Sequence, residues 1–187
     1  MQTEILPMGK RKSGFTIRLS GVGDGQHKYD FELDQKFFDG FDHPDLNGGK
    51  VKAEVLFDKT GEIRKLQFNL TGTVSVVCDR CLEYFDFPVR IKEYLVLKNG
   101  DELTDIDDHL VTIPDDLYEL DIAGYLFEFL VLSLPLKRIH PDIRPGVPGC
   151  DPDMLERLKL LKPRQKEKSE EESDPRWNAL KNLLDKE

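Results

Sequence analysis

Three cysteines occur in the 187 residues, and two of them form the motif Cys78-Asp79-Arg80-Cys81. A C-x-x-C pair brings two sulfur atoms onto one turn, a geometry that suits a tetrahedral metal ion or a redox couple. Cys150 can supply a third ligand, and His140, in the same Pro/Gly-rich loop, can supply a fourth. The sequence therefore predicts a Cys3His site for structural Zn²⁺ formed by Cys78, Cys81, His140 and Cys150.

The same cysteines also have simpler interpretations, which the sequence alone leaves open. Free cysteines are often small buried apolar residues, and His140-Pro141 can simply mark the end of a helix. A disulfide is disfavoured because the cysteine total is odd and no secretory signal is evident. A thioredoxin-like redox centre usually lies where a strand meets a helix, whereas both flanks of this motif have strand character.

The charge balance limits the possible partners. The formal net charge is −9, which argues against a general nucleic-acid binder because phosphate neutralisation needs clustered Lys and Arg. Two local basic strips can still form, one from Lys10, Arg11, Lys12 and Arg18, the other from Arg80, Arg90 and Lys92.

Acidic side chains are concentrated in residues 99–136, a segment with neither Lys nor Arg. These acids are Asp101, Glu102, Asp105, Asp107, Asp108, Asp115, Asp116, Glu119, Asp121 and Glu128. They predict either a solvated loop face or a docking surface for a basic partner, whose association would be accelerated by electrostatic steering.

No part of the sequence indicates export or membrane insertion. The most apolar window, residues 122–136, is too short to cross a bilayer and contains Glu128. No secretory signal is evident at the N-terminus. We therefore expect a cytoplasmic protein with no membrane partner.

Apolar residues at alternate positions predict strands over residues 15–19, 29–33, 51–57, 63–70, 71–77, 84–97 and 110–113. Turns are expected at residues 21–25, 47–49 and 59–62, and a bulge is expected near Lys65. The C-x-x-C motif lies between two predicted strands and should form the tip of a hairpin.

Two helices complete the expected fold. Residues 122–134 are apolar nearly all round, so we expect a helix that packs deep against the sheet, with Asp121 as its N-cap and Pro135 as its stop. Asp151 should cap a short helix over residues 154–161. The predicted fold class is α+β, with a mostly antiparallel sheet, one buried helix and a short C-terminal helix.

The domain organisation follows from composition. Residues 1–162 are predicted to form a single α+β domain, and residues 163–187 a charged linker with an amphipathic tail. Trp177, Leu180 and Leu184 share one face of a helix over residues 175–184 and are predicted to bind a partner. The alternative is that this tail packs back on its own domain.

Three segments together resemble the bacterial YceD family: Val77-Cys78-Asp79-Arg80-Cys81-Leu82-Glu83 after an apolar strand, the apolar segment 122–136 ending in Leu-Pro, and Asp174-Pro175-Arg176-Trp177. The resemblance covers residues 14–184. It implies a role in the accumulation of large-subunit ribosomal RNA. Many members carry a second cysteine cluster after the Leu-Pro segment, where this chain has His140 and Cys150. Either His140 replaces one sulfur ligand, or the metal has been lost.

The resemblance favours a non-enzymatic factor in large ribosomal subunit biogenesis. Its partner would be ribosomal RNA, or a ribosomal or processing protein, and Arg80 would join the tail residues in binding it. The alternative is a metal-dependent hydrolase acting on RNA. The sequence contains no H-E-x-x-H, G-x-S-x-G or Walker motif, so no catalytic residue is assigned and no small-molecule substrate is expected.

Overall fold

The computed structural model of the protein describes residues 14–41, 43–44, 46–61 and 63–161. The chain divides into two compact units, residues 1–150 and 151–187. The first unit contains a six-stranded sheet in the order β2-β3-β4-β5-β7-β6, a two-stranded sheet of β1 and β8, and helices α1 and α2. The strands are β1 Thr16–Arg18, β2 Gly25–Leu33, β3 Leu46–Thr60, β4 Ile63–Val77, β5 Tyr84–Gly100, β6 Thr104–Asp107, β7 Leu110–Pro114 and β8 Glu119–Asp121. The helices are α1 Gln35–Phe38 and α2 Ala123–Leu132.

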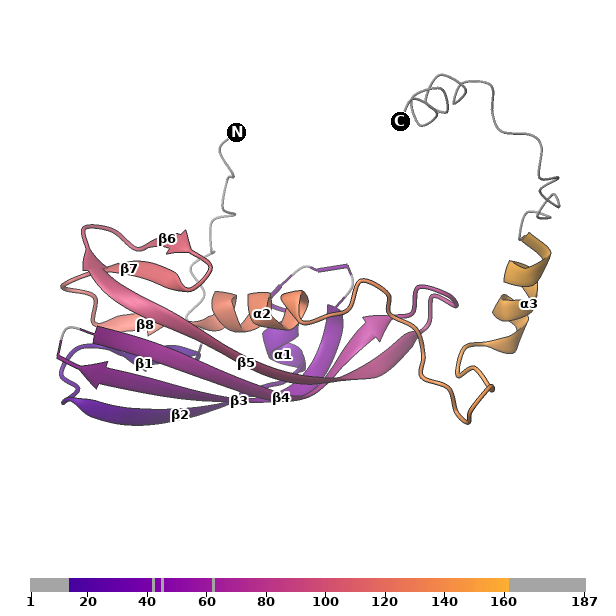
Figure 1. Ribbon diagram of the computed structural model, residues 1–187, viewed down its shortest axis with the longest axis horizontal. Helices are drawn as coiled ribbons and strands as arrows, with labels where there is room; N and C mark the ends of the chain where they lie inside the picture. Colours follow the sequence, from indigo (N-terminus) through magenta and orange to yellow (C-terminus); the bar gives the residue numbers. More distant parts are fainter. Residues whose placement is uncertain (1–13, 42, 45, 62, 162–187) are drawn as a thin grey trace, which may run out of the picture. The chain divides into compact units, whose positions relative to one another are not determined.

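The long strands β3, β4 and β5 form an antiparallel meander at the centre of the larger sheet (Figure 1). Short connections suffice between antiparallel neighbours, and Gly61 turns the chain between β3 and β4 with a φ of 60°. Residues 78–83 connect β4 to β5, so the C-x-x-C motif is the tip of the second hairpin, as the sequence predicts. The α+β class with a mostly antiparallel sheet is confirmed.

The sheet is mixed at one edge, because β7 runs parallel to β5 and antiparallel to β6. The sequence predicts β7 but misses β6 and β8, both of which lie within the acidic segment 99–136. Every residue of β6 is exposed, so it shows no apolar alternation. Strand β8 contributes only Leu120 to the core and is held by pairing with β1.

Two local predictions are wrong. Residues 47–49, expected to form a turn, belong to β3. Because Gly48 and Gly49 have no side chains, the strand can pass close to Gln35 of α1 and to the backbone of β4. A Cβ on Gly49 would lie 2.6 Å from the backbone oxygen of Thr73 and 3.3 Å from the Phe38 ring. The bulge lies between Leu46 and Gly48 instead of near Lys65, where pairing is regular on both sides of β4.

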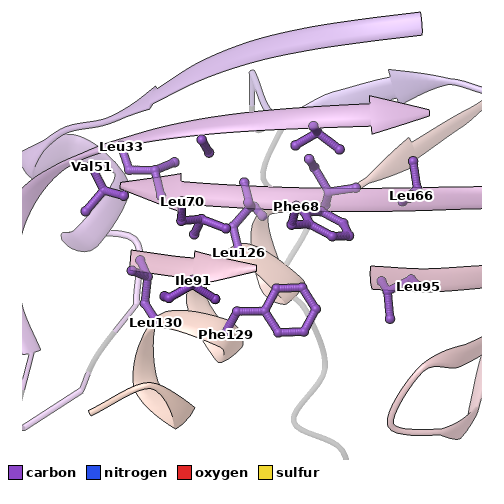
Figure 2. Packing of buried hydrophobic residues seen from close by; sticks show 14 of the residues in the cluster. Leu33, Val51, Leu66, Phe68, Leu70, Ile91, Leu95, Leu126, Phe129 and Leu130 are labelled. Atoms are coloured by element: carbon purple, nitrogen blue, oxygen red, sulfur yellow. The ribbon is translucent and has the colours of Figure 1, made fainter. Parts of the chain in front are cut away.

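The core lies between one face of the larger sheet and α2 (Figure 2). Phe68 of β4 meets Phe129 of α2 edge to face, with ring centroids 5.2 Å apart. Leu126 and Leu130 are fully buried beside them, whereas Leu132 on the same helix is 73% exposed. Asp121 accepts a hydrogen bond from the Ala123 N–H at 2.9 Å, but Ile122 occupies the cap position, one residue later than predicted. The helix therefore buries one face only.

The second unit begins with helix α3, Pro152–Leu161. The Asp151 carboxylate accepts hydrogen bonds from the N–H groups of Asp153 and Met154 at 3.2 and 3.3 Å, as predicted for its cap. The predicted linker and tail, with Trp177, Leu180 and Leu184, lie outside the described residues. Among the described helices, none has the length and apolar character needed to span a bilayer.

Replacing Leu130 with Asp should lower the free energy of unfolding by roughly 3 kcal/mol or more, because it buries an unpaired carboxylate. Leu132→Asp on the same helix should cost no more than about 0.5 kcal/mol, because that side chain faces solvent. Urea titration of both variants gives the comparison. Equal stabilities of the two variants would contradict the placement of α2.

Candidate metal centre

The four predicted ligand residues converge at one end of the larger sheet. Cys78 and Cys81 lie on the tip of the β4–β5 hairpin, and His140 and Cys150 lie on the loop that follows α2. The Sγ atoms of Cys78 and Cys150 are 3.7 Å apart, and Cys81 Sγ is 3.3 Å from His140 Nδ1. All four potential ligand atoms lie within 4.8 Å of one another. The three cysteines are buried and unbridged.

These separations fit a tetrahedral metal ion. With Zn–S and Zn–N bonds of about 2.3 and 2.05 Å, a tetrahedron places sulfur atoms about 3.8 Å apart and a sulfur and a nitrogen about 3.6 Å apart. The separations of 3.7 and 3.3 Å lie close to those values, and the widest separation, 4.8 Å, would close by roughly 1 Å on binding. The donor set and the geometry are therefore compatible with one ion.

Backbone hydrogen bonds shape the hairpin tip. The Cys78 N–H donates to the Glu83 carbonyl at 2.9 Å, and the Leu82 N–H donates to the Cys78 carbonyl at 2.9 Å. Leu82 has a φ of 62°, the only positive φ of a residue other than glycine in the described part of the chain. The resulting tight turn directs Cys78 and Cys81 toward the same point.

An ion pair fastens the loop after α2 to this tip. Asp79 accepts a hydrogen bond from the backbone N–H of Arg138 at 2.6 Å, and its other carboxylate oxygen lies 3.3 Å from the Arg138 guanidinium. In return, the Asp79 N–H donates to the Arg138 carbonyl at 2.8 Å. Arg138 lies two residues before His140, so this contact sets the position of the imidazole. No local sequence pattern indicates this pair, because 59 residues separate its members.

Two further contacts close the loop around the site. The His140 ring packs on Phe85 of β5, with ring centroids 4.7 Å apart. Gly149 passes so close to Pro141 that a Cβ would collide with the Pro141 carbonyl oxygen and lie 3.3 Å from His140 Cβ. Cys150 reaches the cluster only because position 149 has no side chain. The Pro/Gly-rich composition of the loop hinted at such a constraint, but no sequence signal indicated the role of Phe85.

The environment shifts the pKa values of Cys78 and Cys150 in opposite directions. Burial alone raises the pKa of Cys78, but hydrogen bonds from the Cys81, Arg80 and His140 backbone and from the His140 side chain outweigh it and lower the pKa to about 6. Burial, together with the neighbouring Cys78 and Cys81, raises the pKa of Cys150 to about 11. Without a metal, a proton is therefore held more readily by Cys150 than by Cys78.

Comparison with known proteins gives one match. Residues 66–184 match the family model described as "Large ribosomal RNA subunit accumulation protein YceD". The matched span includes all four residues of the cluster. No curated protein and no solved structure matches the chain.

Gly149→Ala should weaken metal retention, because the added methyl group would push Cys150 away from His140. We expect Co²⁺ or Zn²⁺ to dissociate at lower chelator concentrations and the free energy of unfolding to fall by about 1–3 kcal/mol. Gly23→Ala is the matched control, since a Cβ there meets nothing within 4 Å. Metal retention that is equal in the two variants would contradict this account of the loop.

Metal affinity should fall as the pH is lowered, because protons compete for the thiolates. Hydrogen bonds lower the pKa of Cys78 in the folded protein to about 6. The stabilisation that its thiolate gives to the folded state is therefore fully present above the ordinary thiol pKa and is lost as the pH falls through about 6. The plot of log affinity against pH should therefore become steeper below about pH 6, where Cys78 binds a proton that the metal must displace. A chelator competition series across this range measures the slope, and a plot without that change would contradict the thiolate assignment.

Proposed function

The chain belongs to the YceD family, and from this premise we propose that it is a non-enzymatic factor in large ribosomal subunit biogenesis. The family description names the accumulation of large-subunit ribosomal RNA, and the match extends over residues 66–184. On this proposal the protein acts in the cytoplasm by binding ribosomal RNA or a ribosomal or processing protein. The family match is the observation that carries the proposal.

The Cys3His cluster is proposed to hold a structural Zn²⁺. Its ligand atoms are close enough, and its three thiols are buried, which favours a soft ion held by sulfur. When bound, the ion would neutralise the thiolates and cross-link the β4–β5 hairpin to the loop after α2. That cross-link supports a rigid tip, on which Arg80 is half-buried and Leu82 is 68% exposed.

A structural role suits the site better than hydrolysis does. Catalytic zinc sites keep one coordination position for water or substrate, whereas this cluster offers a protein atom for each of four positions. The remaining histidines of the described chain lie elsewhere. His27 contacts the Gly23 carbonyl at 2.9 Å, the His43 ring lies 5.8 Å from that of Phe127 between centroids, and His109 stacks on Tyr94 with centroids 4.4 Å apart. These contacts therefore give the alternative of an RNA hydrolase no support.

Two elements are proposed to contact the partner: Arg80 at the hairpin tip, and the tail residues Trp177, Leu180 and Leu184. The family match runs to residue 184 and so includes the tail. Large aromatic side chains commonly anchor such helical segments in a groove.

Cells that lack this protein should accumulate less large-subunit ribosomal RNA, and the parent chain should restore the level. The Cys78→Ser, Cys81→Ser double variant should fail to restore it, because loss of the ion leaves the tip unsupported. Its zinc content should fall well below one equivalent per chain, and its melting temperature should drop. Quantification of ribosomal RNA, elemental analysis and thermal unfolding measure the three effects.

Position 140 offers a matched control for the metal. His140→Cys keeps four ligand atoms and should keep the zinc, whereas His140→Ala should lose it. A normal level of large-subunit ribosomal RNA in cells without the protein would contradict the proposed function. Full zinc content in the double serine variant would contradict the metal assignment alone.

A further inference from the structure

The outer face of the larger sheet has no covering element within residues 14–150. Helices α1 and α2 both lie on the opposite face, which holds the core (Figure 1). On β3, β4 and β5 the alternate residues that point away from α2 are mostly polar, with Leu56, Pro88 and Val96 among the exceptions, and they are solvent-exposed or half-buried. An open face of three long strands is therefore available to a partner.

Strand register gathers four basic residues on this face. Lys52 of β3 and Arg90 of β5 both lie opposite Thr71 of β4. On the two sides of Thr71 along β4, Lys50 of β3 lies opposite Thr73, and Lys92 of β5 lies opposite Asn69. Because residues two apart on a strand are about 6.8 Å apart and alternate strands are about 10 Å apart, the four cations surround a short polar row of β4.

These four cations are only partly offset by neighbouring acids, since Glu32 of β2 lies opposite Lys52. Within the described residues Lys50, Lys52, Arg90 and Lys92 make no ion pair. An open hollow of about 890 Å³ lies here, and three of the four cations line it. Three acids also line it: Asp30, Glu32 and Glu54. Lys28 offsets one of these negative charges, since its ammonium pairs with Glu54 and lies 3.4 Å from Asp30.

The excess acid of the chain lies on the other side of the sheet. A second hollow of about 660 Å³ is lined by Glu93, Asp105, Asp107, Asp108 and Glu128, together with core-facing residues of β5 and α2. The net charge of −9 thus does not describe the open face. A polyanion would be repelled from the side of α2 and attracted to the cations of β3 and β5.

We propose that Lys50, Lys52, Arg90 and Lys92, with the polar row Asn69, Thr71 and Thr73, bind the phosphates of single-stranded RNA. This inference rests on the proposed function and names the partner. The patch spans three strands, enough for a few phosphates and too small for the shape recognition that double-stranded RNA requires. Hydroxyl and amide groups between the cations can donate to phosphate oxygens.

Binding through this face should depend little on base sequence. Tyr94, the aromatic residue on this face of β5 nearest the patch, already has Lys65 4.6 Å from its ring centroid and His109 stacked against it. It is therefore a poor platform for a base. Arg80 lies roughly 20 Å along the strand from Arg90, so it does not extend the patch, contrary to the basic strip expected from sequence.

The proposal is tested by fluorescence anisotropy of a labelled oligouridylate with the zinc-loaded full chain. Contact with four phosphates predicts a slope of log affinity against log salt of about −3. The triple variant Lys52→Gln, Arg90→Gln, Lys92→Gln should bind about tenfold or more weakly at low salt, with a slope near −1. The triple variant Lys36→Gln, Arg157→Gln, Lys159→Gln removes the same charge from exposed sites on α1 and α3 and should bind like the parent.

Several outcomes would overturn the inference. These are a parent slope near zero, equal losses in both triple variants, and unchanged binding by the sheet variant. If the sheet variant keeps RNA affinity but loses a co-purifying protein, the face is a protein-docking surface instead. The level of large-subunit ribosomal RNA in cells without the protein tests the proposed function separately. A reduced level there, combined with unchanged RNA binding by the sheet variant, would retain the function and reject this site.

Discussion

The register between β4 and β5 is the constraint on which the rest of the first unit depends. It pairs Phe68 with Glu93, Thr71 with Arg90 and Val77 with Tyr84. Because side chains alternate between faces, a slip of one residue would either move Phe68 of β4 out of the core or bring Arg90 of β5 into it. The same slip would displace the hairpin tip, so the core, the metal cluster and the open basic face all derive from one alignment.

The cluster shows how an irregular loop is held by side-chain chemistry. Residues 133–150 have little regular secondary structure of their own, beyond an isolated bridge between Arg144 and Val147. The ends of the loop are held by the Asp79–Arg138 pair and by the thiols around His140. Since α2 is packed on β4 through Phe129, the loop begins at a fixed point and needs only these contacts to complete its path.

Net charge is a poor guide to the partners of this protein, because the fold separates the charges. The acids of residues 99–136 lie on β6, β8, α2 and the connections around them, whereas the outward positions of β3 and β5 carry Lys and Arg that make no ion pair among the described residues. Alternation along a strand makes this separation possible, since Ile91 and Lys92 are neighbours in sequence but face opposite sides of the sheet. A composition-level argument averages over both faces and so misses the basic one.

The sequence by itself determined those elements that are specified by residues close together in the chain. The alternation in β3, β4 and β5, the C-x-x-C hairpin tip, the apolar helix and the Asp151 cap all follow from spacing within a few residues. It also identified Cys78, Cys81, His140 and Cys150 as candidate ligands by residue type. Only the tertiary structure decided that these four meet, that Asp79 holds Arg138, that Gly48 and Gly49 continue a strand, and that β7 runs parallel to β5. Those features depend on contacts between residues far apart in the chain, and such contacts form only when α2 and the sheet pack together and bring the distant segments within reach.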